Sequence, residues 1–155
     1  MKATQLLMVD HEEITALLNT LVGGDFDAGE LDPNKVALFW KLRAALEVHS
    51  EAEEAIFYPA IKSRAETKDL VEQSYREHQD LTELLNAMSP GESGWDDQVQ
   101  TLSNMVNDHL EKEEHELFPQ AQALLGDEEL IRLGERIQSL KSAQPRKGSA
   151  ASTRG

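Results

Sequence analysis

The sequence predicts an all-α fold: an up-down-up-down four-helix bundle with a short C-terminal fifth helix and a flexible tail. Long segments are rich in Leu, Ala and Glu, which favour helix, and the chain has only five prolines. Along four of these segments, apolar residues recur at the three-to-four-residue spacing of a helix that buries one face. The connections between the segments are short, so helices that follow one another should run antiparallel.

Proline and glycine residues mark several of the expected helix ends. The second helix should open with Asp32 as its N-cap and Pro33 as its first helical residue. Pro59 lacks a backbone N–H, so it should kink or end the same helix. Gly126 should end the fourth helix. The four predicted helices cover about residues 3–22, 32–59, 67–88 and 93–126.

The chain beyond the fourth helix divides into two further parts. Residues 127–144 repeat apolar side chains at helical spacing and should form a fifth helix, packed on the bundle or on a partner. Residues 145–155, PRKGSAASTRG, contain no large apolar residue and should form a flexible tail. The expected organisation is therefore a bundle over 1–126, a C-terminal helix and a tail.

Composition and charge exclude several classes of function. The chain has 155 residues, enough for one domain with one core, and no cysteine, which excludes disulfides and thiolate sites. Its 15 Lys and Arg against 29 Asp and Glu give a formal charge of −14, which disfavours nucleic acids and anionic membranes as partners. The apolar run before Asp10 has only four residues, too few for a signal peptide or a membrane span. We therefore expect a cytoplasmic protein.

Six ionisable residues lie on the apolar stripes of the four predicted helices. They are His11 on the first helix, His49 and Glu53 on the second, His78 on the third, and His109 and Glu113 on the fourth. An unpaired buried charge costs roughly several kcal/mol, so one such residue needs a hydrogen bond and six need a shared partner.

A metal centre would supply that partner. Neutral imidazole and carboxylate groups are ligands for divalent iron, zinc and manganese. Residues four apart on a helix differ by only about 40° in direction, so His49 and Glu53 share one face, as do His109 and Glu113. Four histidines and two glutamates are too many for one tetrahedral ion and suit two ions bridged by carboxylates.

An internal repeat supports a symmetric two-metal site. HSEAEEAIFYP at 49–59 and HLEKEEHELFP at 109–119 share histidine, glutamate and proline positions at a constant offset. DHEEITALLNTL at 10–21 aligns with EHQDLTELLNAM at 77–88 in the same way. Two copies of a helical hairpin would pack about a pseudo-twofold axis, and each copy would give the site two histidines and one glutamate.

Four motifs occur in order along the predicted helices: a histidine, HxxxE, a second histidine, and HxxxE followed by an aromatic–proline pair. Over about residues 3–125, this set resembles the hemerythrin-like (HHE cation-binding) family. The resemblance implies a non-haem centre of two iron ions, bridged by oxo or hydroxo groups and by Glu53 and Glu113. By the same analogy, one iron would be held by His11 with His49. The other would be held by His78 with His109.

The chain departs from oxygen-carrying members of this family at one position. Those proteins have a further histidine ligand one turn before the third-helix histidine, where this chain has Ser74. The fifth histidine, His115, lies six residues after His109 and points about 240° away from it, so we expect it on the surface. A centre with four histidines leaves more open coordination positions, which favours reaction with an exogenous ligand over simple oxygen carriage.

Residues near the six have more ordinary interpretations. We expect Tyr58 and Phe118 to pack beside the prolines. Glu54 and Glu114 should face mainly water, with a supporting contact to the metal ligands as the alternative. Tyr75 lies near His78 in sequence and is expected mostly as packing, with an approach to the position left by Ser74 as the alternative.

Two functions of different kinds, and a null case, follow. The first is a di-iron protein that binds or reacts with a small diatomic or peroxide ligand (O2, H2O2 or NO), in oxidative stress for example; a catalase-like or oxidase-like activity is left open. The alternative is a non-enzymatic iron or oxygen sensor, or an iron store or carrier, that signals through a partner, with a homodimer through the C-terminal helix as one option. The null case is a structural bundle without metal.

A ferritin-like oxidase is disfavoured because that class uses Glu-x-x-His. Zinc and manganese suit the same ligands, and the preference for iron rests on the resemblance.

Overall fold

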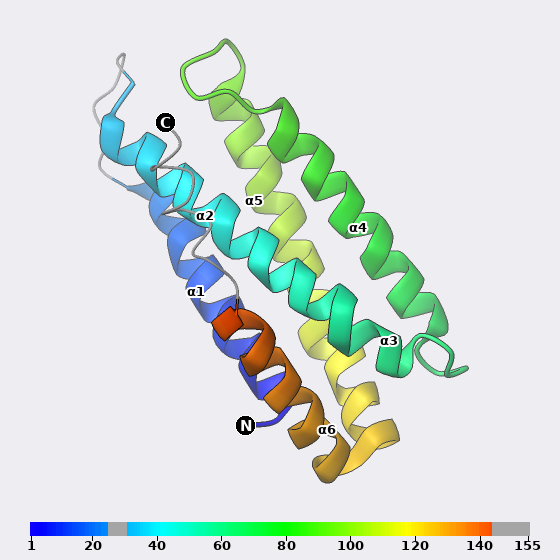
Figure 1. Cartoon of the computed structure of the whole chain (residues 1–155). Helices are drawn as coiled ribbons and strands as arrows, with labels where there is room; N and C mark the ends of the chain where they lie inside the picture. The colour runs from blue at the N-terminus through cyan, green and yellow to red at the C-terminus, as the bar shows by residue number, and fades with distance from the viewer. Residues whose placement is uncertain (25–30, 144–155) are drawn as a thin grey trace.

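A computed structural model describes residues 1–24 and 31–143, and within these ranges the secondary structure is helical, with no strand. This confirms the predicted all-α bundle (Figure 1). The helices are α1 Ala3–Gly23, α2 Pro33–Ala52, α3 Tyr58–Ile61, α4 Lys68–Ala87, α5 Trp95–Lys112 and α6 Phe118–Ala143. A π-helical turn, Glu53–Phe57, continues α2 directly into α3, and a second one, Glu113–Leu117, continues α5 directly into α6. Among the described residues, no helix has both the length and the apolarity needed to cross a membrane.

The start of α2 forms as its sequence predicts. Pro33 is the first helical residue, where its missing N–H costs no hydrogen bond. The Asp32 side chain accepts a hydrogen bond from the backbone N–H of Asn34 at 2.8 Å. This cap satisfies one of the free N–H groups of the first turn.

The two prolines of the repeat, Pro59 and Pro119, each follow a π-helical turn, and Pro59 is the one that was expected to kink or end its helix. The backbone N–H of Tyr58 donates to the carbonyl of Glu53, and that of Phe118 donates to the carbonyl of Glu113, both five residues back. Such a turn takes up one additional residue, and the helical chain then continues through Pro59 to Ile61. Each π-helical turn begins at one of the two predicted metal-binding glutamates, so the break in regular geometry lies at the candidate site.

The apolar core forms two clusters on either side of the polar residues. On α1, Leu7 belongs to one cluster and Ile14 to the other, with buried His11 between them. On α5 and the turn that follows, Val106 and Leu117 bracket the second HxxxE in the same way. The six candidate ligands therefore lie in a layer inside the bundle that is sealed by apolar side chains at both ends.

The C-terminal part of α6 packs along α1 (Figure 1). The helix kinks at Gly126, whose φ of 76° is in the left-handed region that favours glycine. Beyond the kink, Leu130, Leu133 and Ile137 are buried in the same cluster as Leu7. Residues 127–143 therefore contact the bundle, while the expected division of the chain at residue 126 stays a prediction. The predicted tail, 145–155, lies outside the described residues.

Gly134 allows α6 to approach the start of α1 closely. A Cβ atom at this position would lie 2.1 Å from the carbonyl oxygen of Met1 and 3.0 Å from the nitrogen of Ala3. We expect Gly134→Ala to lower the free energy of unfolding by about 1–2 kcal/mol in urea denaturation, because the overpacking exceeds the better helix propensity of alanine. Gly23→Ala is the control, since a Cβ there meets no atom within 4 Å. Equal stabilities of the two variants would contradict this close approach.

Candidate metal centre

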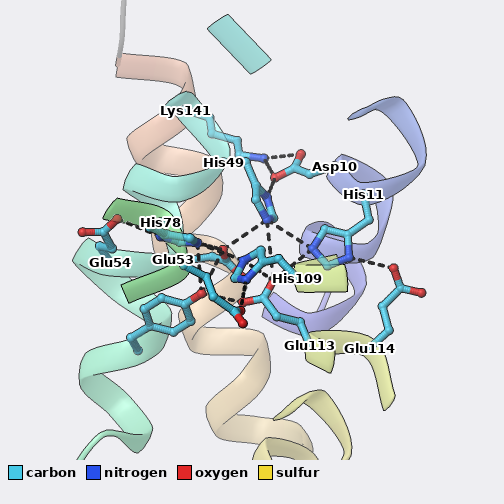
Figure 2. A network of polar contacts seen from close by, with 12 residues as sticks. Asp10, His11, His49, Glu53, Glu54, His78, His109, Glu113, Glu114 and Lys141 are labelled. Carbon is cyan, nitrogen blue, oxygen red and sulfur yellow. Dashed lines mark hydrogen bonds and ion pairs between the residues drawn. The ribbon is translucent and has the colours of Figure 1, made fainter. Parts of the chain in front are cut away.

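The fold brings all six predicted residues together, and all six are buried (Figure 2). Their potential ligand atoms form two groups, and within each group the atoms lie within 4.8 Å of one another. Glu53 and Glu113 belong to both groups. One group adds His11 and His49 to the two glutamates, and the other adds His78 and His109.

The histidine rings direct their Nε2 atoms toward the centre of the site. The Nε2 atoms of His11 and His49 are 3.2 Å apart, and those of His78 and His109 are 3.1 Å apart. Glu53 lies between the halves, with its Oε1 atom 3.2 Å from His49 Nε2 and 3.1 Å from His78 Nε2. Glu113 Oε1 lies 3.2 Å from His11 Nε2 and 3.5 Å from His109 Nε2.

The other nitrogen of every ring contacts a carboxylate outside this layer. The four Nδ1 contacts are His11 with Glu114 at 2.9 Å, His49 with Asp10 at 2.9 Å, His78 with Glu54 at 2.8 Å and His109 with Glu77 at 2.7 Å. A carboxylate can only accept, so each Nδ1 carries the proton and donates it. In a neutral ring, Nε2 is then a bare lone pair that faces the site. A histidine that binds a metal is commonly oriented in this way.

The arrangement of donor atoms fits a pair of cations. Neutral rings would place two Nε2 lone pairs 3.1–3.2 Å apart in each half, which is repulsive unless a positive charge lies between them. Glu53 Oε2 and Glu113 Oε1 are buried without a hydrogen-bond partner, a costly state for a carboxylate. A donor set of imidazole and carboxylate groups suits divalent transition metals. The cluster is therefore capable of holding metal ions.

Without metal, protons balance the charges of the cluster. Burial disfavours a charged His49 ring, but the nearby Glu53 carboxylate and the Asp10 hydrogen bond outweigh it and raise the His49 pKa well above its usual range. Burial likewise opposes ionisation of Glu53, yet the charge of His49 holds the Glu53 pKa well below normal. For His78, burial is outweighed by hydrogen bonds to Glu53 and Glu54, and its pKa rises to about 9. Metal ions must displace such protons to bind.

The stability of the metal-free protein should therefore fall as the pH rises from about 6.5 to 9. His78 binds its proton more tightly in the folded than in the unfolded chain, so its contribution is complete below pH 6.5 and is lost as the pH passes about 9. The difference of about 2.5 in pKa corresponds to at most about 3 kcal/mol. His49 acts in the same direction. Glu77, whose pKa is lowered to about 2 by its hydrogen bond with His109, stays ionised throughout this range.

Urea denaturation of the metal-free protein at pH 6, 7.5 and 9.5 measures this effect. Metal-loaded protein is the control, because its rings carry no such protons and its stability should not show the same fall. A metal-free protein that is equally stable at pH 6 and 9.5 would contradict the proton-balanced site.

Tyr58 packs in the apolar core, as expected, but its hydroxyl also belongs to the site, which the sequence did not predict. Its hydroxyl lies 2.5 Å from Glu113 Oε2, 3.1 Å from Glu53 Oε1 and 3.2 Å from His78 Nε2. In a regular α-helix, a residue five positions after Glu53 would point about 140° away from it. The π-helical turn brings these two positions onto one side, and the following proline is the only mark of it in the sequence.

The second half of the repeat lacks this hydroxyl. Phe118 holds the position that matches Tyr58 and stacks on His11, with ring centroids 5.4 Å apart and planes inclined by 24°. Buried Ser74 lies one turn before His78 on α4, whereas the matching residue of α1 is the apolar Leu7. Tyr75 packs edge-on against Tyr58, with centroids 5.2 Å apart. The site is thus symmetric in its six candidate ligands and asymmetric in its surroundings.

The four carboxylates on the Nδ1 atoms include two that the sequence pointed to and two that it did not. Glu54 is exposed, as expected, and Glu114 is half-buried, and both also contact histidines of the site, which was the alternative. Asp10 and Glu77 were not singled out at all. The repeat carried a signal, since each of these acids directly precedes a histidine and contacts the histidine of the neighbouring helix. His115 is exposed, as expected.

Comparisons with known proteins agree with this site. A crystal structure of a hemerythrin HHE cation-binding-domain protein from Mycobacterium kansasii has the same fold, with a TM-score of 0.77 and 23% identity, over 92% of this chain and 86% of that one. A protein of Nostoc sp. named DNA nickase is 28% identical over 160 residues, and the match covers all of this chain but only 44% of that protein. The sequence itself matches the hemerythrin HHE cation-binding domain over residues 2–121. Because that match spans most of its length, this chain belongs to the hemerythrin HHE cation-binding domain family.

Proposed function

We propose that this chain holds two iron ions in the six-residue site and binds or reacts with a small oxidant, O2, H2O2 or NO. The observation that carries the proposal is the sharing of Glu53 and Glu113 by two groups of candidate ligands. A carboxylate that belongs to both groups could serve both ions, which suits a bridged pair and not two separate sites. The assignment of the ligands is part of this proposal.

The residues of the chain would hold the ions as follows. His11 and His49 would bind one ion, His78 and His109 the other, and the two glutamates both. A pair of iron ions supplies redox chemistry with small oxidants. The four outer carboxylates fix the orientation of the histidine rings, and the apolar clusters above and below limit the access of water. Tyr58 provides a hydroxyl proton beside both glutamates.

The asymmetry of the site supports reaction over simple carriage. Tyr58 places a hydroxyl group 3.2 Å from His78 Nε2, and Ser74 stands at the position where oxygen carriers of the family have a further histidine. In the metal-free protein, burial and the charges of Glu53 and Glu113 raise the pKa of Tyr58 well above its usual value, so the hydroxyl keeps its proton at neutral pH. A proton donor of this kind suits the reduction of an oxidant.

A second candidate function is an iron-dependent or oxygen-dependent sensor, or an iron carrier, without turnover. It is favoured by the Nostoc protein, in which the matching region is less than half of a longer chain, as expected of a module that acts through other parts. The formal charge of −14 disfavours direct contact with DNA, so we keep the absence of a nucleic-acid partner as a prediction. A cytoplasmic location and a homodimer through the C-terminal helix stay predictions as well.

Metal counting and steady-state kinetics test these proposals. The metal-free protein is reconstituted with ferrous iron under anaerobic conditions, and bound iron is counted per chain after gel filtration. Two ions are expected for the wild type and for His115→Ala, which changes an exposed histidine, and fewer for His109→Ala. Less than half an ion per chain in the wild type would refute the proposal. Turnover of peroxide by the loaded protein then distinguishes an enzyme from a sensor, and competition with zinc and manganese tests the choice of metal.

A further inference from the structure

The C-terminal segment of α6 reaches back to the metal site through Lys141. The Nζ atom of Lys141 lies 2.5 Å from both carboxylate oxygens of Asp10, a residue 131 positions earlier in the chain. Asp10 Oδ2 in turn lies 2.9 Å from His49 Nδ1. Figure 2 shows this series, in which Lys141 contacts Asp10, and Asp10 contacts the ring that points into the site.

The other half of the site has the same series with a local lysine. Lys112 Nζ lies 3.0 Å from Glu77 Oε2, and Glu77 Oε1 lies 2.7 Å from His109 Nδ1. Lys112 is three residues after His109, at the end of the same helix α5. This contact forms wherever α5 and α4 pack, whereas the contact of Lys141 requires the C-terminal segment, residues 127–143, to be docked.

Docking of that segment is specific, and it shields the Lys141–Asp10 pair. Gly134 lets the backbone of α6 rest on the first residues of α1, and buried Leu133 and Ile137 hold it there. The side chain of Lys141 is 27% exposed and that of Asp10 is 16% exposed, compared with 50% for Lys112. A pair of charges with little solvent around it is screened less than a surface pair, so it can fix the position of the carboxylate.

We propose that Lys141 is a positioning residue that holds Asp10 against His49, so that docking of residues 127–143 and metal retention in the half of the site with His11 and His49 are coupled. This inference rests on the proposed two-metal function. Without Lys141, the Asp10 carboxylate turns toward solvent and the His49 ring loses its orientation. Coupling of this kind is reciprocal, so metal in this half also stabilises the docked segment.

Lys141→Met tests the coupling, with Lys112→Met as the matched control from the other half. The full chain is loaded with ferrous iron under anaerobic conditions, and release to a chelator is followed with time. Loss of a residue that orients a ligand typically weakens metal binding 10–100-fold, so we expect Lys141→Met to release one of its two ions about tenfold faster. Lys141→Arg should restore the wild-type rate. Circular dichroism checks that each variant is folded.

Amide hydrogen exchange of residues 127–143 gives a second readout, in the wild type and in both lysine variants. In the wild type, iron should slow exchange in this segment. Iron should no longer do so in Lys141→Met, and it should still do so in Lys112→Met. Equal hydrogen exchange with and without iron in the wild type would overturn the coupling. Iron release from Lys141→Met at the wild-type rate would overturn it too, as would equal effects of the two lysine variants on hydrogen exchange in the segment. These outcomes would overturn the coupling in a protein that still binds two ions. A wild type that binds no iron would instead overturn the proposed function, and the coupling with it.

Discussion

Replacing Glu53 with alanine is expected to lower the bound iron from two ions per chain to one or none. Glu53 belongs to both groups of candidate ligands, and its Oε1 atom lies within 3.2 Å of the Nε2 atoms of His49 and His78. Glu54, in the same π-helical turn, contacts His78 at Nδ1 and not at the Nε2 atom that faces the site, so it does not replace Glu53. Elemental analysis after anaerobic reconstitution measures the loss.

The stability of the loaded protein should change in the same experiment. A ligand that binds only the folded state stabilises it by about 2.7 kcal/mol at one hundred times its dissociation constant. The wild type should therefore melt at a higher temperature with iron than without it, and in Glu53→Ala this difference should shrink or vanish. Calorimetry with and without iron records both values. Two bound ions in Glu53→Ala would refute a bridging role for this residue.

Glu51→Ala is the matched control for this prediction. Glu51 lies two residues before Glu53 in α2 and is exposed, whereas Glu53 is fully buried. Its replacement removes the same charge from the same helix without removing a candidate ligand. We expect two ions per chain and the wild-type melting temperature. An equal loss of iron in both variants would mean that overall charge, and not the bridging position, determines metal binding.

The sequence predicted the six candidate ligands because they recur at the spacing of residues on one face of a regular α-helix. His49 and Glu53 lie one turn apart on a stripe that is otherwise apolar, and the partner hairpin repeats the same spacing. Periodicity needs only regular geometry to place such residues on one face, and α2 is regular as far as Ala52. All six are buried where the pattern placed them.

The role of the Tyr58 hydroxyl was not predicted because the regular α-helix ends where the π-helical turn begins, at Glu53. Any rule based on the spacing of an α-helix directs Tyr58 away from the site, and only the i to i+5 hydrogen bonding of the π-helical turn brings it in. Two of the outer carboxylates were missed for a different reason. Asp10 and Glu77 contact the histidine of the neighbouring helix in the same hairpin, so their role depends on how the two helices of each hairpin pack, which local spacing does not encode.

The same argument explains why the two halves of a repeated sequence are not equivalent. The repeat places the histidines and their outer carboxylates at matching positions in both halves. The lysine that contacts the outer carboxylate, however, comes from α5 in one half and from α6 in the other. One half also has the hydroxyl of Tyr58, where the other has the ring of Phe118. We therefore expect the two ions to differ in how tightly they are held and in what can react beside them.

Tyr58→Phe is expected to keep both ions and to slow peroxide turnover by a factor of about 10²–10⁴. The tyrosine hydroxyl is the proton donor closest to the two shared glutamates, and a positioned acid or base typically contributes a factor of this size. The substitution removes one oxygen atom and leaves the aromatic ring in place. Iron per chain, which should remain two, is measured beside the steady-state rate.

Tyr75→Phe is the control for this variant, because Tyr75 packs on the Tyr58 ring but is not among the residues that contact the glutamates in the described structure. It should turn over peroxide at the rate of the wild type. If Tyr58→Phe retains two ions and the full rate, the hydroxyl orients the glutamates and takes no part in proton transfer. If Tyr58→Phe loses iron, the hydroxyl helps to hold the metal. Only an unchanged metal count with a reduced rate supports Tyr58 as the acid that distinguishes the two halves of the site.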